Sequence, residues 1–195
     1  MRKAVIGLGN PGREYAETRH NVGFRVVERL STRIGAPLVP APGALCGRGQ
    51  VAGVEVVLCE PQRFMNRSGE VVARLAASEG LAPADILVVH DELDLVLGRV
   101  QVKRGGGSAG HRGVESIIER LGVREFPRVR IGVGRPPEGL DPVDFVLVPF
   151  SEDEQKLVEQ AIVRAAEAVE TWLGAGLEAA MRLANVRVPE PGEGS

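Results

Sequence analysis

Hydrophobic and polar residues alternate along this chain with two different periods. Continuous apolar runs predict buried strands, and strict apolar–polar alternation, as in "RVQVK", predicts strands with one exposed face. On these grounds strands are expected at 3–8, 85–89, 99–103 and 128–134, and a hairpin with a turn near Gly53 is expected at 50–59. The segment "PLVPAPG" at 37–43 is expected to be a proline-rich loop.

Apolar residues spaced by three or four positions predict helices between these strands. The expected helices cover 21–34, 68–79, 113–121, 151–173 and 177–183. Asn21 is placed as the N-cap of the first helix, and Ser151 and Glu154 form a capping box at the start of the fourth. Alternating strands and helices are typical of an α/β fold. We therefore predict a single domain over residues 1–187, with a twisted, mixed and mainly parallel sheet flanked by helices, and a frayed acidic tail at 188–195.

The first strand runs into glycines spaced as G-x-G-x-x-G, at Gly7, Gly9 and Gly12. This spacing alone is a weak indication of dinucleotide binding, which also needs a helix that begins within the glycines. Here Pro11 interrupts the turn, and the polar-leaning stretch "REYAETRHN" follows before helical periodicity resumes. We reject a nicotinamide cofactor, and we expect the glycines to turn the chain so that Asn10 lies at the strand end.

Three strands are followed by residues of the kinds found in active sites. They are Asn10 and His20 after the first strand, Phe64 and Asn66 after the strand ending at Cys59, and His90 and Asp91 after 85–89. In parallel α/β sheets, ligands bind outside the carboxyl ends of the strands. If the three strands are neighbours, a histidine, an aspartate and two asparagines converge at one edge.

Such a set suits acyl transfer to water. A histidine accepts a proton from water near neutral pH, and a carboxylate bonded to its other ring nitrogen fixes the tautomer and stabilises the imidazolium. Amide side chains hold the substrate or stabilise a developing oxyanion. No serine elbow is present and neither cysteine lies within these motifs, which favours direct attack by water.

Each of these residues also has an alternative interpretation. Asn10 suits a turn, Asn66 suits a helix cap, and His20 suits an exposed surface. Asp91 suits a solvated acidic loop, or a metal site with His90 and His111. Those three residues lack a recognised ligand spacing, so we expect no metal.

Charge is unevenly distributed along the chain, although the formal net charge is only −2. Residues 1–97 carry 11 basic and 11 acidic side chains, residues 98–135 carry 9 basic and 3 acidic, and residues 136–195 carry 4 basic and 12 acidic. A basic segment within a mildly acidic protein predicts a localised anion site. Charges that alternate on solvated faces would give the same counts.

The basic segment contains the glycine-rich stretch "KRGGGSAGHRG". Lys103 and Arg104 precede the glycines, and His111 and Arg112 lie at the start of the next helix. Backbone N–H groups of such a loop and of a helix N-terminus can bind phosphate. The stretch is not a Walker A loop, and a mobile surface lid is the alternative.

Composition excludes several other classes. Hydrophobic content of 44% and charged content of 26% are ordinary for a globular protein, and no apolar run approaches the ~18 residues of a membrane span. The apolar run after Lys3 is too short for a signal peptide, so we expect a cytoplasmic protein without membrane attachment. Cys46 and Cys59 match no metal or redox motif and are expected to be buried, reduced thiols.

Four motifs, taken together and in order, resemble those of the bacterial peptidyl-tRNA hydrolases. They are "GLGNPGREYAETRHNVGF", "FMNRSGE", "HDELDL" with "GGGSAGHRG", and "RVRIGVGRP", and the resemblance covers about residues 3–185. It implies the α/β fold of that family and a monomeric, metal-independent esterase without cofactor or obligate protein partner. The implied reaction cleaves the ester between a peptide and the 3′-terminal ribose of tRNA, which recycles tRNA released from stalled ribosomes.

The resemblance also implies a role for each matching residue. His20 would activate water, Asp91 would orient and support His20, and Asn10 would distinguish a blocked peptidyl nitrogen from a free amine. Contacts with the substrate near the tRNA 3′ end are implied for Tyr15, Phe64 and Asn66, and contacts with acceptor-arm phosphates for Lys103 and Arg130. His111 is also expected to contact the substrate or tRNA.

One position departs from the family pattern. The family usually reads Gly-His-Asn-Gly where this chain has Arg112 in "GHRG", and the asparagine is expected to hold substrate. Arg112 either substitutes for it with charge-assisted donors or points away. A non-catalytic RNA-binding relative is a rival interpretation, but the retained Asn10, His20, Asn66 and Asp91 argue against it.

Overall fold

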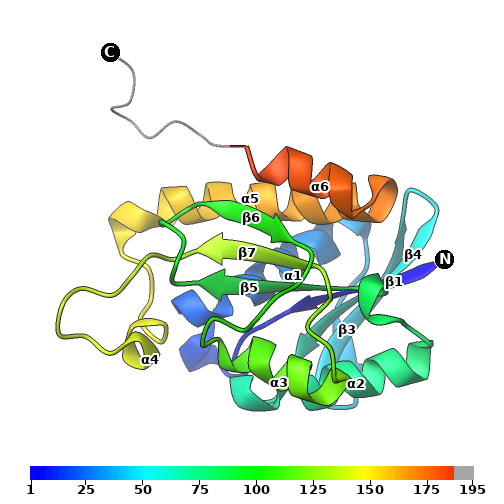
Figure 1. Cartoon of the computed structure of the whole chain (residues 1–195), viewed down its shortest axis with the longest axis horizontal. Coiled ribbons are helices and arrows are strands. Elements are labelled where there is room, and N and C mark those ends of the chain that lie inside the picture. The colour runs from blue at the N-terminus through cyan, green and yellow to red at the C-terminus, as the bar shows by residue number, and fades with distance from the viewer. Residues whose placement is uncertain (187–195) are drawn as a thin grey trace.

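The computed structural model describes residues 1–186 and contains one seven-stranded sheet with helices on both faces (Figure 1). The strand order is β2-β3-β4-β1-β5-β7-β6. The strands are β1 (Arg2–Gly7), β2 (Val39–Ala41), β3 (Ala44–Val51), β4 (Val54–Pro61), β5 (Ile86–Glu92), β6 (Val100–Lys103) and β7 (Arg128–Gly132). Strands β4, β1, β5 and β7 run parallel, and the outer pairs β2–β3, β3–β4 and β6–β7 are antiparallel. The predicted α/β class with a mixed, mainly parallel sheet is confirmed.

The helices form two layers that enclose separate apolar cores. They are α1 (Val22–Ile34), α2 (Ser68–Glu79), α3 (Arg112–Leu121), α4 (Pro142–Phe145), α5 (Glu152–Ala175) and α6 (Leu177–Ala184). One core joins α1, α5 and α6 to the sheet, and the other joins α2 and α3 to its opposite face (Figure 1). No helix within residues 1–186 has both the length and the apolar character that a membrane crossing needs. The tail predicted at 188–195 lies outside the described residues.

The glycines that follow β1 turn the chain and allow close packing. A Cβ on Gly7 would lie 2.4 Å from the carbonyl oxygen of Gly23, so α1 packs directly on the first strand. Gly12 has a φ of +110°, a conformation that side chains disfavour. Short 3₁₀ turns at Arg13–Tyr15 and Arg19–Asn21 follow, and α1 begins only at Val22. The sequence indicated that no helix begins within the glycines, and the structure confirms this.

Several predicted boundaries were wrong. The hairpin is longer than expected because β3 begins at Ala44, and the proline-rich loop contains the short edge strand β2, where a proline is tolerated because its missing N–H faces outward. Strand β5 continues to Glu92 because its pairing with β7 extends past the last β1 pair at Val89, so Asp91 lies within the strand. Cys59 is buried as expected, but Cys46 is only half-buried.

Candidate active site

A cleft of about 250 Å³ opens at the carboxyl ends of the parallel strands. Seven of the ten predicted site residues line it: Asn10, His20, Phe64, Asn66, Asp91, His111 and Arg112. They come from the segments that follow β1 and β4, from the end of β5, and from the start of α3. The expected convergence of the strand ends is therefore present in the fold.

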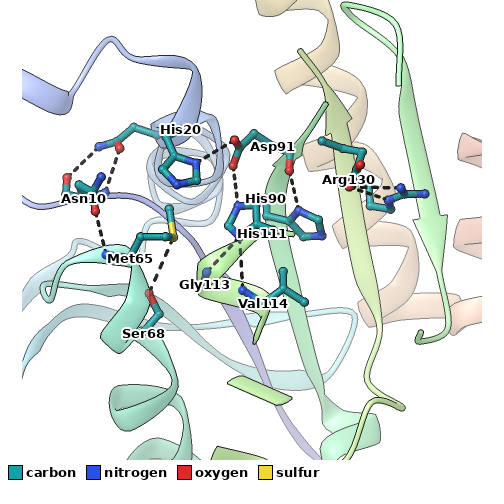
Figure 2. Close-up of polar contacts among 12 residues, drawn as sticks. Asn10, His20, Met65, Ser68, His90, Asp91, His111, Gly113, Val114 and Arg130 are labelled. Carbon is teal, nitrogen blue, oxygen red and sulfur yellow. Dashed lines mark hydrogen bonds and ion pairs between the residues drawn. The ribbon is translucent and has the colours of Figure 1, made fainter. Parts of the chain in front are cut away.

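Asp91 accepts hydrogen bonds from two histidines of the cleft. Its carboxylate lies between two histidines, with Oδ2 2.8 Å from His20 Nδ1 and Oδ1 2.7 Å from His111 Nε2 (Figure 2). The aspartate is 2% exposed. Each carboxylate oxygen thus has one ring nitrogen as its partner.

The backbone at the start of α3 assigns the tautomer of His111. The Nδ1 atom of His111 accepts hydrogen bonds from the N–H groups of Gly113, at 3.1 Å, and Val114, at 3.3 Å. This nitrogen therefore carries no proton, and the opposite nitrogen donates to Asp91. An ionised carboxylate only accepts hydrogen bonds, so His20 donates its Nδ1 proton to Asp91, and the Nε2 of the neutral ring has a free lone pair.

The two histidines keep Asp91 ionised. Burial alone raises the pKa of the Asp91 carboxyl, but electrostatic attraction to His20 and His111, together with the hydrogen bonds that their rings donate, outweighs burial and holds that pKa well below its usual range. An ionised carboxylate is the form that stabilises an imidazolium on His20.

His90, next to Asp91 on β5, plays a structural part that sequence reasoning missed. Its Nδ1 donates to the backbone carbonyl of Asp91 at 2.7 Å, and its ring packs edge-on against His111 with centroids 4.8 Å apart. Burial, followed by repulsion from His111, lowers the pKa of His90 well below its usual value. His90 therefore packs as a neutral ring and adds no charge beside Asp91.

Asn10 is held rigidly by three hydrogen bonds. Its Oδ1 accepts the backbone N–H of Met65 at 2.8 Å, and the side chain of Asn21 bonds both its backbone N and its backbone O at 2.9 Å. Asn21 occupies the N-cap position of α1 as predicted, but its side chain makes no capping hydrogen bond and bonds Asn10 instead. With Oδ1 occupied by Met65, the Nδ2 group is the part of the Asn10 amide left to donate to a ligand in the cleft that Asn10 lines.

Phe64 and Asn66 form the exposed rim of the cleft. The Tyr15 ring does not line the cleft but meets the Phe64 ring at 88°, with centroids 6.4 Å apart. Asn66 does not cap the next helix, since Arg67 occupies the N-cap position of α2. This leaves the amide of Asn66 available to a ligand.

The opposite wall of the cleft is the segment around α4, which sequence reasoning missed. Pro142, Val143, Val146 and Leu147 line the cleft from this side. The carboxylate of Asp141 accepts the N–H of Val143 at 2.9 Å, and Pro142 occupies the first helical position. An N-cap aspartate followed by proline is a recognisable helix start, so the pattern "DPVDF" could have predicted this turn.

Arg19 lies in the turn that carries His20 and contacts the α4 wall of the cleft. Its guanidinium is buried over the ring of Phe145 at 4.3 Å and donates to the carbonyls of Val148 and Pro149 at 3.0 and 2.7 Å. It also pairs with Glu154 at 2.7 Å. The turn that carries His20 and the α4 wall are therefore one connected unit.

The basic segment contains a buried arginine and two partly buried basic side chains outside the cleft. Arg128 is 2% exposed and donates to the carbonyl oxygens of Gly107 at 2.6 Å and Arg124 at 3.0 Å, so it fixes the glycine-rich loop. Lys103 and Arg130 lie outside the cleft on β6 and β7, and Arg130 pairs with Glu92 at 3.2 Å. Burial and repulsion from Arg130 and Arg128 lower the pKa of Lys103.

Among residues 1–186, one group of three side chains has ligand atoms close enough to share a metal ion: His20, Asp91 and His111, whose ligand atoms lie within 4.8 Å of one another. Their hydrogen bonds account for this clustering. The nitrogen of His111 that faces Asp91 carries a proton, because the α3 amides occupy the other nitrogen. His90 is not part of the group, since its Nδ1 faces a backbone carbonyl.

The fold and the cleft together define an α/β protein with the parts of a water-activating hydrolase. A family model described as peptidyl-tRNA hydrolase matches residues 4–191. The chain belongs to the peptidyl-tRNA hydrolase family. The family resemblance drawn from the four motifs is thereby confirmed.

Individual relatives agree with this assignment. The chain is 48% identical to a peptidyl-tRNA hydrolase of Moorella thermoacetica over 183 residues, which is 93% of this chain and 96% of the relative. It is 48% identical to that of Mycobacterium sp. (strain KMS) over 181 residues, or 92% and 94% of the two chains. A crystal structure of peptidyl-tRNA hydrolase from Acinetobacter baumannii superposes with a TM-score of 0.90 at 38% identity and 94% coverage of each chain.

Proposed function

We propose that this chain hydrolyses the ester between peptide and tRNA in peptidyl-tRNA, by direct attack of a water molecule that His20 activates. The observation that carries the proposal is the orientation of His20. Its Nδ1 is bonded to the ionised Asp91, and its Nε2 is left free beside the cleft. A general base so placed needs only a water and an ester carbonyl within hydrogen-bond reach.

The step balances without a covalent enzyme intermediate. His20 Nε2 takes a proton from water while the water oxygen bonds to the ester carbonyl carbon. The carbon–oxygen bond to the ribose then breaks, and the ribose oxygen takes the proton back from the imidazolium. Asp91 stabilises that imidazolium, and burial of the pair strengthens the interaction because little water screens it.

Asn10 supplies selectivity for a blocked amino group. Its Oδ1 is engaged by Met65, so it presents the cleft with an N–H donor and not an acceptor. Such a donor pairs with the amide carbonyl that precedes the ester-linked residue in a peptide. An aminoacyl group lacks that carbonyl and carries an ammonium group, which an N–H donor repels.

The rim and the basic face would receive the tRNA. Phe64 and Asn66, with Tyr15 behind Phe64, offer a stacking surface and an amide near the 3′ end. His111 takes part through Asp91, and Arg112 offers a cationic donor at the cleft beside Asn66. Lys103 and Arg130 suit phosphates of the acceptor arm, outside the cleft.

The proposed machinery is complete in a single chain. Every residue named above comes from one copy, and the water is activated by a histidine, so the reaction is expected of a monomer without metal or cofactor. Its substrate arises in translation, which agrees with a cytoplasmic location.

The direct test compares N-acetyl-aminoacyl-tRNA with unblocked aminoacyl-tRNA, both with EDTA present, and follows release of free tRNA. Rapid cleavage of the blocked ester alone is the expected result. Binding of tRNA without cleavage would favour the RNA-binding rival. Cleavage that disappears with EDTA and returns with a divalent cation would overturn the metal-independent mechanism.

A further inference from the structure

Cys46 and Cys59 are direct cross-strand partners in the hairpin of β3 and β4. Both thiols are free. Cys59 lies in the apolar core beneath α2, and Cys46 packs at the margin of the same core. The two side chains therefore lie on one face of the sheet, far along the hairpin from its turn.

The turn determines which kind of pair the cysteines form. Ala52 and Gly53 have φ values of +49° and +79°, as in a two-residue hairpin turn, and such a turn is closed by a hydrogen-bonded pair, here Val51 and Val54. The register continues without a bulge, and hydrogen-bonded and non-hydrogen-bonded pairs alternate along it. The cysteine pair lies five steps from the closing pair and is therefore non-hydrogen-bonded.

Non-hydrogen-bonded pairs bring side chains closest together. Their Cα atoms are typically about 4.5 Å apart, which falls within the range that a disulfide spans. Their Cβ atoms are typically within about 1 Å of the separation that a disulfide requires. The hairpin therefore accepts this bond with little movement of the strands.

The two thiols differ in exposure and in pKa, as do the thiol that an oxidant attacks and the second thiol that then closes the disulfide. Cys46 is half-buried, and a hydrogen bond from Cys59, aided by the charge of Arg48, lowers the pKa of the Cys46 thiol. The hydrogen bond with Cys46 and burial raise the pKa of the Cys59 thiol well above its usual value. An oxidant from solvent thus meets Cys46 first, with Cys59 directly behind it.

We propose that Cys46 and Cys59 form a redox-modification site that closes to a reversible intrachain disulfide when hydroperoxides are present. The Cys46 thiolate attacks one oxygen of the peroxide, the O–O bond breaks, and the sulfur becomes a sulfenic acid as hydroxide leaves. The Cys59 sulfur then attacks the Cys46 sulfur, the S–O bond breaks, and the hydroxyl group leaves as water with the Cys59 proton. A dithiol reductant reverses the bond by thiol–disulfide exchange. This site is independent of the hydrolytic cleft.

The test uses the full chain with hydrogen peroxide, followed by alkylation with N-ethylmaleimide under denaturing conditions and mass spectrometry. Trypsin cuts after Arg48, which separates the cysteines into peptides 34–48 and 49–63. We expect an unalkylated protein, lighter than the reduced chain by two hydrogens, whose two peptides remain linked until dithiothreitol releases them. Two alkylated cysteines after peroxide treatment, or a link only between separate chains, would overturn the proposal.

Two conservative variants test the assigned order. With Cys59→Ser, the sulfenic acid on Cys46 persists and is trapped by dimedone. With Cys46→Ser, Cys59 stays alkylatable after the same treatment, because it is buried. If dimedone instead traps Cys59 in the Cys46→Ser variant, Cys59 is the thiol that reacts first with peroxide, and the proposed order of reaction is wrong. Whether the disulfide forms at all is decided by the experiment on the unsubstituted chain.

Discussion

His20 Nδ1 and Asp91 Oδ2 lie 2.8 Å apart, although 71 positions separate the two residues in the chain. The contact exists because β1 and β5 are neighbouring parallel strands, with Gly7 opposite Val89. The turn after β1 returns His20 to the end of β5. One hydrogen bond thereby decides which nitrogen of His20 faces the cleft.

The substitution His20→Ala should abolish most turnover while leaving tRNA affinity nearly unchanged. A positioned general base contributes about 10²–10⁴-fold to a rate, so kcat should fall by that factor. Single-turnover cleavage of N-acetyl-aminoacyl-tRNA measures the first quantity and filter binding of deacylated tRNA the second. A variant that keeps most of its kcat would show that another group activates the water.

Asp91→Asn should lower kcat by about 10²–10⁴-fold in a protein that still folds. An asparagine has one acceptor oxygen, so its NH₂ group must face a ring N–H of either His20 or His111. One ring then has to change tautomer, and if His20 does so, its Nε2 carries a proton and cannot accept one from water. Kinetics together with a thermal melt separate this effect from unfolding, and unchanged kcat in the folded variant would contradict it.

Arg112→Ala should raise KM about tenfold with little change in kcat, since a charge-assisted hydrogen bond contributes about 1.5 kcal/mol or more. Arg112 lines the cleft at the first turn of α3. Arg112→Asn, which restores the usual family residue, should recover much of the loss. The matched control is Arg120→Ala near the other end of the same helix. Equal KM values for Arg112→Ala and the control would mean that Arg112 points away from the substrate.

Lys103→Ala should weaken tRNA binding and make it less sensitive to salt. Loss of one phosphate contact reduces the slope of log K against log salt by about one. Lys156→Ala, an exposed lysine on α5, should leave the slope unchanged. The experiment is a salt titration of affinity with all three proteins, and identical slopes would exclude Lys103 from the interface.

Glu60 should make the protein less stable as the pH rises from about 4.5 to about 8. Burial, with repulsion from Glu28 and Cys46, raises the pKa of this carboxyl from 4.5 to about 8. Between those values the unfolded chain releases the proton and the folded chain keeps it, so the free energy of unfolding falls with rising pH and levels off above about 8. The loss amounts to a few kcal/mol, since one pKa unit corresponds to about 1.4 kcal/mol.

Glu60→Gln should flatten this dependence, whereas Glu138→Gln, in an exposed loop, should not. Urea unfolding at a series of pH values gives the comparison. A wild-type protein whose stability rises across the same window would contradict the assignment.

The sequence alone determined the class of fold, the order of most elements and the family. Periodicity reports which face of each strand or helix is apolar, and burial of those faces, as in Val88 and Val89 of β5, dictates the layers. It also placed Asn10, Phe64, Asn66 and Asp91 near strand ends, where parallel sheets bind ligands. The edge strand β2 and the α4 turn were not predicted, because such short elements contain too few residues to show a periodic pattern.

Only the tertiary structure decided the state of each polar group. Asn21 is the N-cap residue that the sequence predicts, but its side chain bonds Asn10, because the cleft edge brings the two backbones together. His111 reads as an anion ligand, yet the amides of α3 and Asp91 use both of its nitrogens. Arg128 opens a strand that the sequence predicts to be half-exposed, yet Arg128 itself lies buried beneath the glycine-rich loop. Hydrogen-bond partners depend on distances between remote segments, and a one-dimensional pattern of residue types does not contain those distances.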